Sequence, residues 1–408
     1  MMILKKILIG LCAVVISIFC IPRVSSASTE VDALLKLLVR KGVVSEQEAE
    51  ELRGEVKKET AGQPVVWTSN RPVKAVKFGG KLEIRYEDSQ GEEPSFKMTN
   101  FEPNITVDVN EHFSIKGKME CTTDTAFVNE GYAKYSGLPA IGGDGQVGKF
   151  RRASFGLPQA GSDRVSIDYS LLARAFTGER QLGAEYNRYF KKAGLLGPVK
   201  LVLGIFNGGD VGNREAGDNA KSQVLFIADR AGDTDDTQNK EFCFRSTIEP
   251  VKGLQIGGSM SAGKLSAADL STLNTYLGTL YSKKKKERFG ADISYKFKKI
   301  PMELRYEYMH GKTSGLGLDS WYAMWILRDI GKSKKLDLYA RYSSLDPDIS
   351  PAPSSYTWDL NQATLGAIWN FNKMTRLQGE YEFNGEEPGA GTGKVDNDML
   401  RIEWQTDF

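Results

Sequence analysis

A cluster of cationic side chains near the middle of the sequence is the group of residues best suited to chemistry on a ligand. Arginine presents a planar fork of N–H donors that matches phosphate or carboxylate oxygens, and lysine attracts the same oxygens as a point charge. Three acidic residues, Asp163, Asp168 and Glu179, lie within the same stretch. The candidate pathway for anions consists of Lys149, Arg151, Arg152, Arg164, Arg174 and Arg180.

Enzymatic chemistry has little support in the sequence. Histidine occurs only as His112 and His310, and neither has an evident nucleophile, as Ser–His–Asp chemistry would require. The cysteines lack metal-ligand spacing. We therefore expect no catalytic residue, metal, cofactor or nucleic-acid partner. The chain has 54 basic and 52 acidic residues, so any charge selectivity must come from the placement of side chains.

Apolar and polar residues alternate with a period of two from Phe78 to the end of the chain. The pattern is clear in KLEIRYE (81–87), ADISYKF (291–297) and TRLQGEYEF (375–383). It is typical of β-strands with one apolar and one polar face. A water-soluble antiparallel sheet is the alternative. The polar series is heavily charged on strand after strand, which favours a barrel with a water-filled lumen.

Connections of alternating length support the barrel. Short ones lie at 110–111, 250–253, 298–300, 329–332 and 372–373, and long ones at 153–180, 207–240, 262–286 and 343–360. Short periplasmic turns and long external loops are characteristic of outer-membrane barrels. We therefore predict an all-β fold, a transmembrane antiparallel β-barrel of about 16 strands. Closure pairs every backbone group in lipid, and the charged series then faces water inside.

The connection 153–180 is the candidate constriction, because a loop this long within a compact domain is usually functional. The alternation predicts that Phe150 faces lipid, and it therefore places Lys149 and Arg151 in the lumen. The alternative is that the arginines pair with carboxylates and only brace the wall. A lysine-rich run at 281–289 is expected at an external loop end, where it either contacts lipopolysaccharide phosphates or stays solvated.

The N-terminal part reads as three segments. Residues 1–27 have two lysines, an apolar run and small residues, which predicts a secretory signal peptide. Residues 28–60 predict a periplasmic helical or coiled-coil segment, in which Ser45 and Glu48 have the spacing of a capping box. Residues 61–77 are expected to be a linker before the barrel at 78–408.

Several motifs in order resemble the phosphate-selective porin O and P family. They include QVGKFRRASFGL (146–157), YSLLARAF (169–176), ERQLG (179–183), LVLGIFNGGD (201–210) and the closing NDMLRIEWQTDF (397–408). Two positions depart from the family pattern, with Gln159 near a usual Glu and Ser154 in place of a usual Pro.

The resemblance implies a homotrimeric outer-membrane porin whose third external loop narrows each pore. It also implies that Phe408, the terminal aromatic residue, serves as the assembly signal for the barrel-insertion machinery. We expect a channel in the outer membrane of a Gram-negative type cell, passing small hydrophilic solutes, with a preference for anions such as phosphate. The alternative is a structural sheath or docking scaffold around a partner, for example a redox protein. Lipid and lipopolysaccharide are the expected surroundings.

Overall fold

The computed structural model describes most of the region expected to form the barrel. The described residues are 73–89, 93–139, 141–157, 165–177, 180–191, 193–208, 240–277, 281–348, 357–388 and 398–408, with Val39, 45–48, Glu50 and strand β1 (Val65–Trp67). The predicted signal peptide and Arg164 lie outside these ranges. The chain divides into two compact units, Met1–Val65 and Val66–Phe408.

In the first unit, the capping box predicted at Ser45 and Glu48 is confirmed. The Ser45 N–H donates to Glu48 Oε2 at 2.8 Å, and the Glu48 N–H donates to Ser45 Oγ at 3.2 Å. These hydrogen bonds from the Ser45 backbone and hydroxyl hold the pKa of the Glu48 carboxyl below its usual range. A helix therefore begins here, as the sequence pattern indicates.

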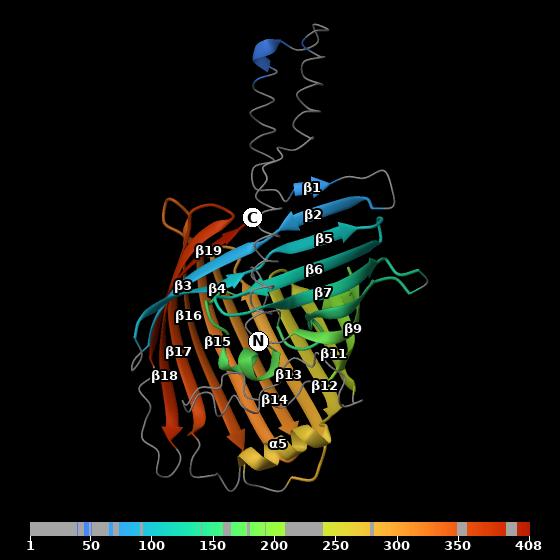
Figure 1. Ribbon diagram of the computed structural model, residues 1–408, viewed down its shortest axis with the longest axis vertical. Helices are drawn as coiled ribbons and strands as arrows, with labels where there is room; N and C mark the ends of the chain where they lie inside the picture. Colours follow the sequence, from blue (N-terminus) through green and yellow to red (C-terminus); the bar gives the residue numbers. More distant parts are fainter. Residues whose placement is uncertain are drawn as a thin grey trace, which may run out of the picture. The chain divides into compact units, whose positions relative to one another are not determined.

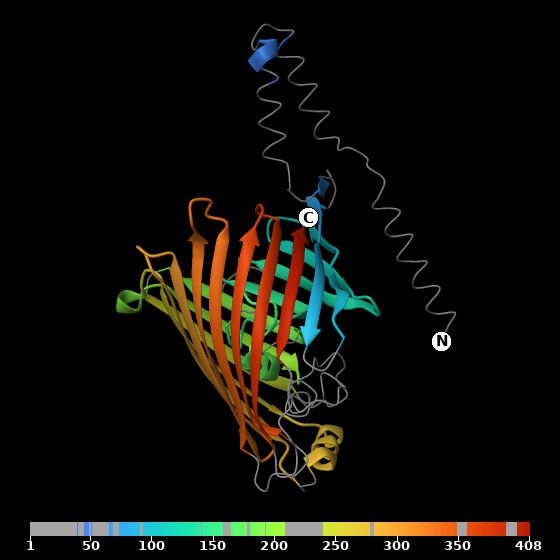
Figure 2. The ribbon, with the colours of Figure 1, turned by 90° about the vertical axis from the view of Figure 1, so that its left-hand side faces the viewer.

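The described part of the second unit contains a closed antiparallel barrel of sixteen strands, which confirms the predicted fold class. Two barrel strands are each interrupted once, β2 (Ala75–Gly79) with β3 (Lys81–Ser89), and β4 (Ser95–Phe101) with β5 (Asn104–Asp108). The others are β6 (Phe113–Cys121), β7 (Ala126–Ser136), β8 (Asp144–Arg151), β9 (Arg180–Phe190), β10 (Val199–Asn207), β11 (Lys240–Val251), β12 (Leu254–Lys264), β13 (Lys285–Lys296), β14 (Met302–Thr313), β15 (Leu316–Ile330), β16 (Leu336–Asp348), β17 (Thr357–Asn370), β18 (Thr375–Pro388) and β19 (Met399–Asp407). Each pairs with its neighbour in sequence, and β19 pairs with β3 to close the ring (Figures 1 and 2).

The alternation of residues sorts side chains to the two faces of the wall. On β19, Arg401 and Glu403 are buried inside, whereas Ile402 and Trp404 are about 40% exposed on the outer face. A closed barrel leaves no unpaired strand edge, so this outer face can meet hydrocarbon. Among the described residues, no helix is long and apolar enough to cross a membrane.

Several expected boundaries differ from the structure. Strands β1 and β2 occupy part of the stretch 61–77 that was expected to be a linker. Pro103, which cannot donate a hydrogen bond to a strand ladder, lies in the break between β4 and β5. Two connections at the end opposite the short turns are themselves short hairpins, at 122–125 and 314–315, so the lengths alternate less regularly than expected. Helix α5 (Ala267–Leu277) lies in the long connection between β12 and β13 (Figure 1).

The seam of the barrel is fixed by the last residue. The Phe408 N–H donates to Gly80 O at 3.0 Å, and the Gly80 N–H donates to Phe408 O at 2.7 Å. The Phe408 ring stacks on Phe101 and lies where a side chain at Gly80 would be. Gly80 therefore leaves room for the terminal ring at the break between β2 and β3.

We predict that Gly80→Val weakens this seam, because the new methyl groups would overlap the Phe408 ring. The folded barrel should lose its resistance to SDS at a temperature several degrees lower, as measured by gel mobility after heating. Gly379→Val is the matched control, since no atom lies near the position of its added Cβ. Equal unfolding temperatures for the two variants would show that the ring does not lock the seam.

Candidate functional site

The connection between β8 and β9 turns into the barrel and fills part of its interior. Its described residues, 152–157 and 165–177, include a π-helical turn at Ala173–Thr177 and are nearly all buried. Phe155, Leu172 and Phe176 are at most 2% exposed. They belong to one apolar cluster with inward-facing residues of β10 and β14 to β17, namely Phe206, Met309, Leu318, Tyr322, Met324, Ile326, Tyr339, Leu345, Leu360 and Ile368. We call the described residues of this connection, 152–157 and 165–177, the inner loop.

Polar groups of the wall bind the backbone of the inner loop. The N–H groups of Ala153 and Ser154 donate to Glu185 Oε2 on β9, at 2.9 and 3.0 Å. Across the lumen, the Leu157 N–H donates to Glu307 Oε1 on β14 at 2.7 Å, and the Ile167 N–H donates to Glu380 Oε2 on β18 at 2.9 Å. Buried N–H groups need such acceptors, so these carboxylates set the path of the loop.

Arginines add charged anchors to the inner loop. Arg152 Nη1 donates to Glu241 Oε1 on β11 at 2.8 Å, and Arg152 Nη2 donates to Phe176 O at 3.1 Å. On the opposite wall, Arg341 Nη1 donates to Ser166 Oγ at 2.5 Å. Asp168 accepts an ion pair from Arg401 Nη2 at 3.0 Å and another from Arg174. The loop is therefore held by ion pairs as well as by apolar packing.

A polar cavity of about 740 Å³ remains beside the inner loop. It lies between Ile167–Tyr169 and the wall formed by β3 to β9, and it reaches the turn between β17 and β18. Among the described residues that line it, eight are basic and six are acidic. The apolar cluster occupies the side of β10 and β14 to β17, whereas this cavity lies on the side of β3 to β9, with further lining residues from β18 and β19.

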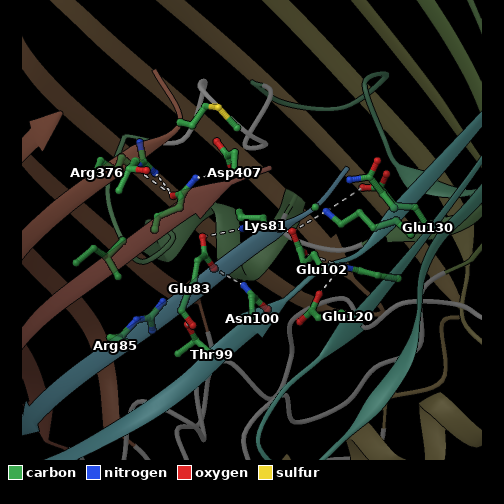
Figure 3. Close-up of a pocket in the computed structure, with 18 of the residues that line it drawn as sticks. Lys81, Glu83, Arg85, Thr99, Asn100, Glu102, Glu120, Glu130, Arg376 and Asp407 are labelled. Carbon is green, nitrogen blue, oxygen red and sulfur yellow. Dashed lines mark hydrogen bonds and ion pairs between the residues drawn. The ribbon is translucent and has the colours of Figure 1, made fainter. Parts of the chain in front are cut away.

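Opposite charges alternate along the cavity wall. Lys81 Nζ lies 2.7 Å from Glu83 Oε1 and 3.3 Å from Glu102 Oε2, and Figure 3 shows Lys81 between these two carboxylates. Lys118 Nζ continues the series at 2.9 Å from Glu102 Oε2. Glu130 then accepts Lys116 at 3.1 Å and Arg180 at 3.2 Å. Paired charges hold each other in place, so a solute meets a fixed local pattern of charge.

The six residues predicted to form the anion pathway have different positions in the structure. Arg151 and Arg180 line the cavity, and Arg151 Nη2 donates to the hydroxyl of Tyr169 on the inner loop at 2.7 Å. Arg152 and Arg174 are buried and anchor the loop, which was the alternative role for these arginines. Lys149 is half-buried and does not line the cavity, and Arg164 lies outside the described residues.

The prediction that Phe150 faces lipid is wrong. Phe150 is 2% exposed, and its ring packs edge-on against Tyr132 and Phe206, with centroids 5.8 and 5.7 Å away. Val147 is 58% exposed and takes the outer face on β8. Inside the barrel Phe150 belongs to the same apolar cluster as Phe155 and Phe176 of the inner loop. The argument that placed Lys149 and Arg151 in the lumen by alternation therefore fails, although Arg151 does line the cavity from the end of β8.

Several cavity residues were not singled out from the sequence. Lys116, Lys118 and Glu130 come from β6 and β7, far from the cationic cluster in sequence. The alternation in FSIKGKMEC predicts the inward face of Lys116 and Lys118. It does not predict that the inner loop would leave space on their side of the barrel.

Comparison with solved structures gives outer-membrane barrels. The outer-membrane channel DcaP of Acinetobacter baumannii matches with a TM-score of 0.58 and 11% identity, over 84% of this chain and 99% of that chain. OmpF of Salmonella typhi matches with a TM-score of 0.57 and 11% identity, over 84% and 100%. An anion-selective porin from Comamonas acidovorans matches with a TM-score of 0.53 and 13% identity, over 82% of this chain and 99% of that chain. At these identities the likeness shows a shared fold.

No protein-family model and no curated protein matches the sequence. The resemblance to the phosphate-selective porin O and P family therefore stays a prediction. The shared fold places the chain among porin-like barrels in architecture.

We predict that Arg152→Ala destabilises the barrel, because it removes one partner of a buried ion pair and a donor to the inner loop. Loss of a buried partner costs on the order of 3–5 kcal/mol. Arg328→Ala, which removes a half-exposed partner of Glu303, is the control and should cost about 0–1 kcal/mol. Unfolding of both variants in urea would be followed by tryptophan fluorescence. Equal losses of stability would contradict the anchoring role of Arg152.

Proposed function

We propose that this protein is an outer-membrane channel for passive diffusion of small hydrophilic solutes. The observation that carries the proposal is the polar cavity between the inner loop and the wall of β3 to β9. A self-supplied loop that fills one side of the lumen confines solutes to the other side. Selectivity then depends on the width of this passage and on its fixed charges. No cofactor or conformational cycle is required.

The outer surface supports an outer-membrane location. Exposed apolar and aromatic side chains cover it, among them Phe242, Phe289, Trp325 and Leu365. Such a surface suits lipid, and the closed hydrogen-bond ring leaves no strand edge exposed to it. In this orientation the short turns and the helical segment 28–60 are periplasmic, residues 1–27 are a cleaved signal, and the long connections are external.

We propose a preference for anions, with phosphate among the solutes. The cavity has two more basic than acidic residues among those described, and Arg151, Arg180 and Lys116 are three of its cations. Glu130 pairs with two of these three cations, which moderates their field. The expected selectivity is therefore weak. A porin of Comamonas acidovorans with the same fold is described as anion-selective.

A homotrimer is proposed as the assembled form, supported by the trimer form described for OmpT of Vibrio cholerae, which shares the fold with a TM-score of 0.51 at 14% identity. Phe408 is proposed as the signal for the barrel-insertion machinery, consistent with its place at the seam. The sheath hypothesis is less well supported. The chain's own inner loop occupies the space that an enclosed partner such as a redox protein would need.

We predict that the purified protein forms ion channels in planar bilayers, with a reversal potential under a salt gradient that favours chloride over potassium. Arg151→Ala with Arg180→Ala should shift the reversal potential towards cations, because two cations leave the cavity wall. Glu130→Gln should shift it towards anions. Lys298→Ala, an exposed turn residue outside the cavity, should change neither.

Absence of conductance would refute the channel. A wild-type reversal potential that favours potassium would refute the anion preference and leave the channel standing.

A further inference from the structure

Three lysines lie on the outer face of the barrel at the end remote from the short turns, and two more lie just before β13. Lys264 on β12 lies directly opposite Lys285 on β13 in the strand register. Lys312 on β14 lies opposite Glu287 of β13. Glu287 is two residues after Lys285 and therefore on the same face of that strand. Lys283 and Lys284 precede β13. All five are exposed, and we call them the lysine cluster.

The charge run in the sequence therefore does not act as one unit. Lys286, the fourth lysine of KKKK (283–286), points inward, is 2% exposed and pairs with Glu241 at 2.8 Å. Lys285 points outward, and Lys264 and Lys312 lie near it on the neighbouring strands. The cluster is a product of the fold, which the sequence run shows only in part.

Among the described residues of this face, few acids lie near the lysine cluster. Glu287 lies within it and accepts Lys285 at 2.7 Å. The next acid on this face, Asp319, contacts His310 at 3.0 Å and the Tyr308 hydroxyl. Like charges directly opposite each other destabilise a sheet pair. A multivalent anion that bridges Lys264 and Lys285 would remove this repulsion.

An apolar hollow of about 760 Å³ adjoins the lysine cluster on the same outer face. Met260 and Ala262 line it and lie on the same face of β12 as Lys264. From there it extends past Phe242 and Ile205 to Val147 on β8. An amphipathic ligand could place its anionic group at the lysines and its hydrocarbon in the hollow.

We propose that the lysine cluster and the apolar hollow together bind a phosphorylated, acylated glycolipid of the outer leaflet. A phosphate contacts Lys264, Lys285 and Lys312, and an acyl chain occupies the hollow. Cationic side chains beside a lipid surface attract anionic headgroups, and burial of methylenes adds affinity. The inference rests on the proposed outer-membrane orientation, because the cluster must meet the leaflet that carries such lipids.

The test uses the full-length protein in detergent and lipid A, a diphosphorylated, acylated glucosamine disaccharide, as the probe. Binding would be counted by native mass spectrometry. The variant Lys264→Gln/Lys285→Gln/Lys312→Gln should bind at least tenfold more weakly than wild type, with a smaller dependence on salt. Lys298→Gln/Lys299→Gln/Lys332→Gln removes the same charge from exposed residues at the short-turn end and should bind like wild type. Resistance to SDS without heating would establish that both variants are folded.

Two further arms identify the ligand. The same phosphorylated disaccharide without acyl chains should bind at least tenfold more weakly than lipid A, and Ala262→Arg should weaken lipid A alone. Inorganic phosphate at millimolar concentration should not displace lipid A. Equal binding of the two disaccharides, or displacement by phosphate, would reduce the site to a free-anion site and overturn the proposal. Equal binding of lipid A by the two triple variants would also overturn the proposal.

The test is separable from the proposed channel function. Bilayer conductance of the cluster variant should equal that of wild type, because these lysines lie outside the cavity. Normal conductance with unchanged lipid binding would overturn the lipid site alone. If Ala262→Arg changed the oligomeric state and left lipid binding intact, the hollow would be an interface between copies, and the proposal would fail.

Discussion

The structure depends on one constraint, the pairing of every backbone N–H and C=O of a wall that faces hydrocarbon. A sheet meets it in lipid only by closing on itself, and here closure is completed by the pairing of β19 with β3 and of Phe408 with Gly80. Once the ring is closed, alternation leaves one face for lipid and the other for the interior. The charged series then lies inside, where charges such as Arg401 and Glu382 can pair.

The inner loop occupies part of the space that the closed wall encloses. Sixteen strands enclose more space than wall side chains alone can fill, so a long connection can enter. The inner loop fills one side of this space more completely than the other. Its apolar residues pack on β10 and β14 to β17, and its polar segment at Asp168 and Tyr169 faces the wall of β3 to β9. The interior is therefore asymmetric, with the apolar cluster on the side of β10 and β14 to β17 and the polar cavity on the side of β3 to β9.

Much of this could be predicted from local sequence patterns. The barrel, most strand positions and the inward turn of the connection after β8 follow from alternation and loop length, which are local properties. The roles of individual cations could not be predicted in the same way. Arg151 and Arg152 are adjacent in sequence, yet one contacts the cavity and the other pairs with Glu241, more than eighty residues away. Phe150 shows what alternation leaves open: it separates Val147 and Phe150 onto opposite faces, but it does not say which of the two faces is the inner one.

In the proposed channel, solutes pass between the inner loop and the wall of β3 to β9. This path can be tested by thiol modification during single-channel recording, in a background with Cys121→Ser and Cys243→Ser. Lys116→Cys lies in the cavity, and Ser343→Cys lies on β16 under the apolar cluster, where Ser343 is fully buried. A bulky water-soluble thiol reagent should reduce the current through the Lys116→Cys channel and leave the Ser343→Cys channel unchanged. Block of the Ser343→Cys channel with no effect on Lys116→Cys would place the passage on the other side of the loop and contradict the account.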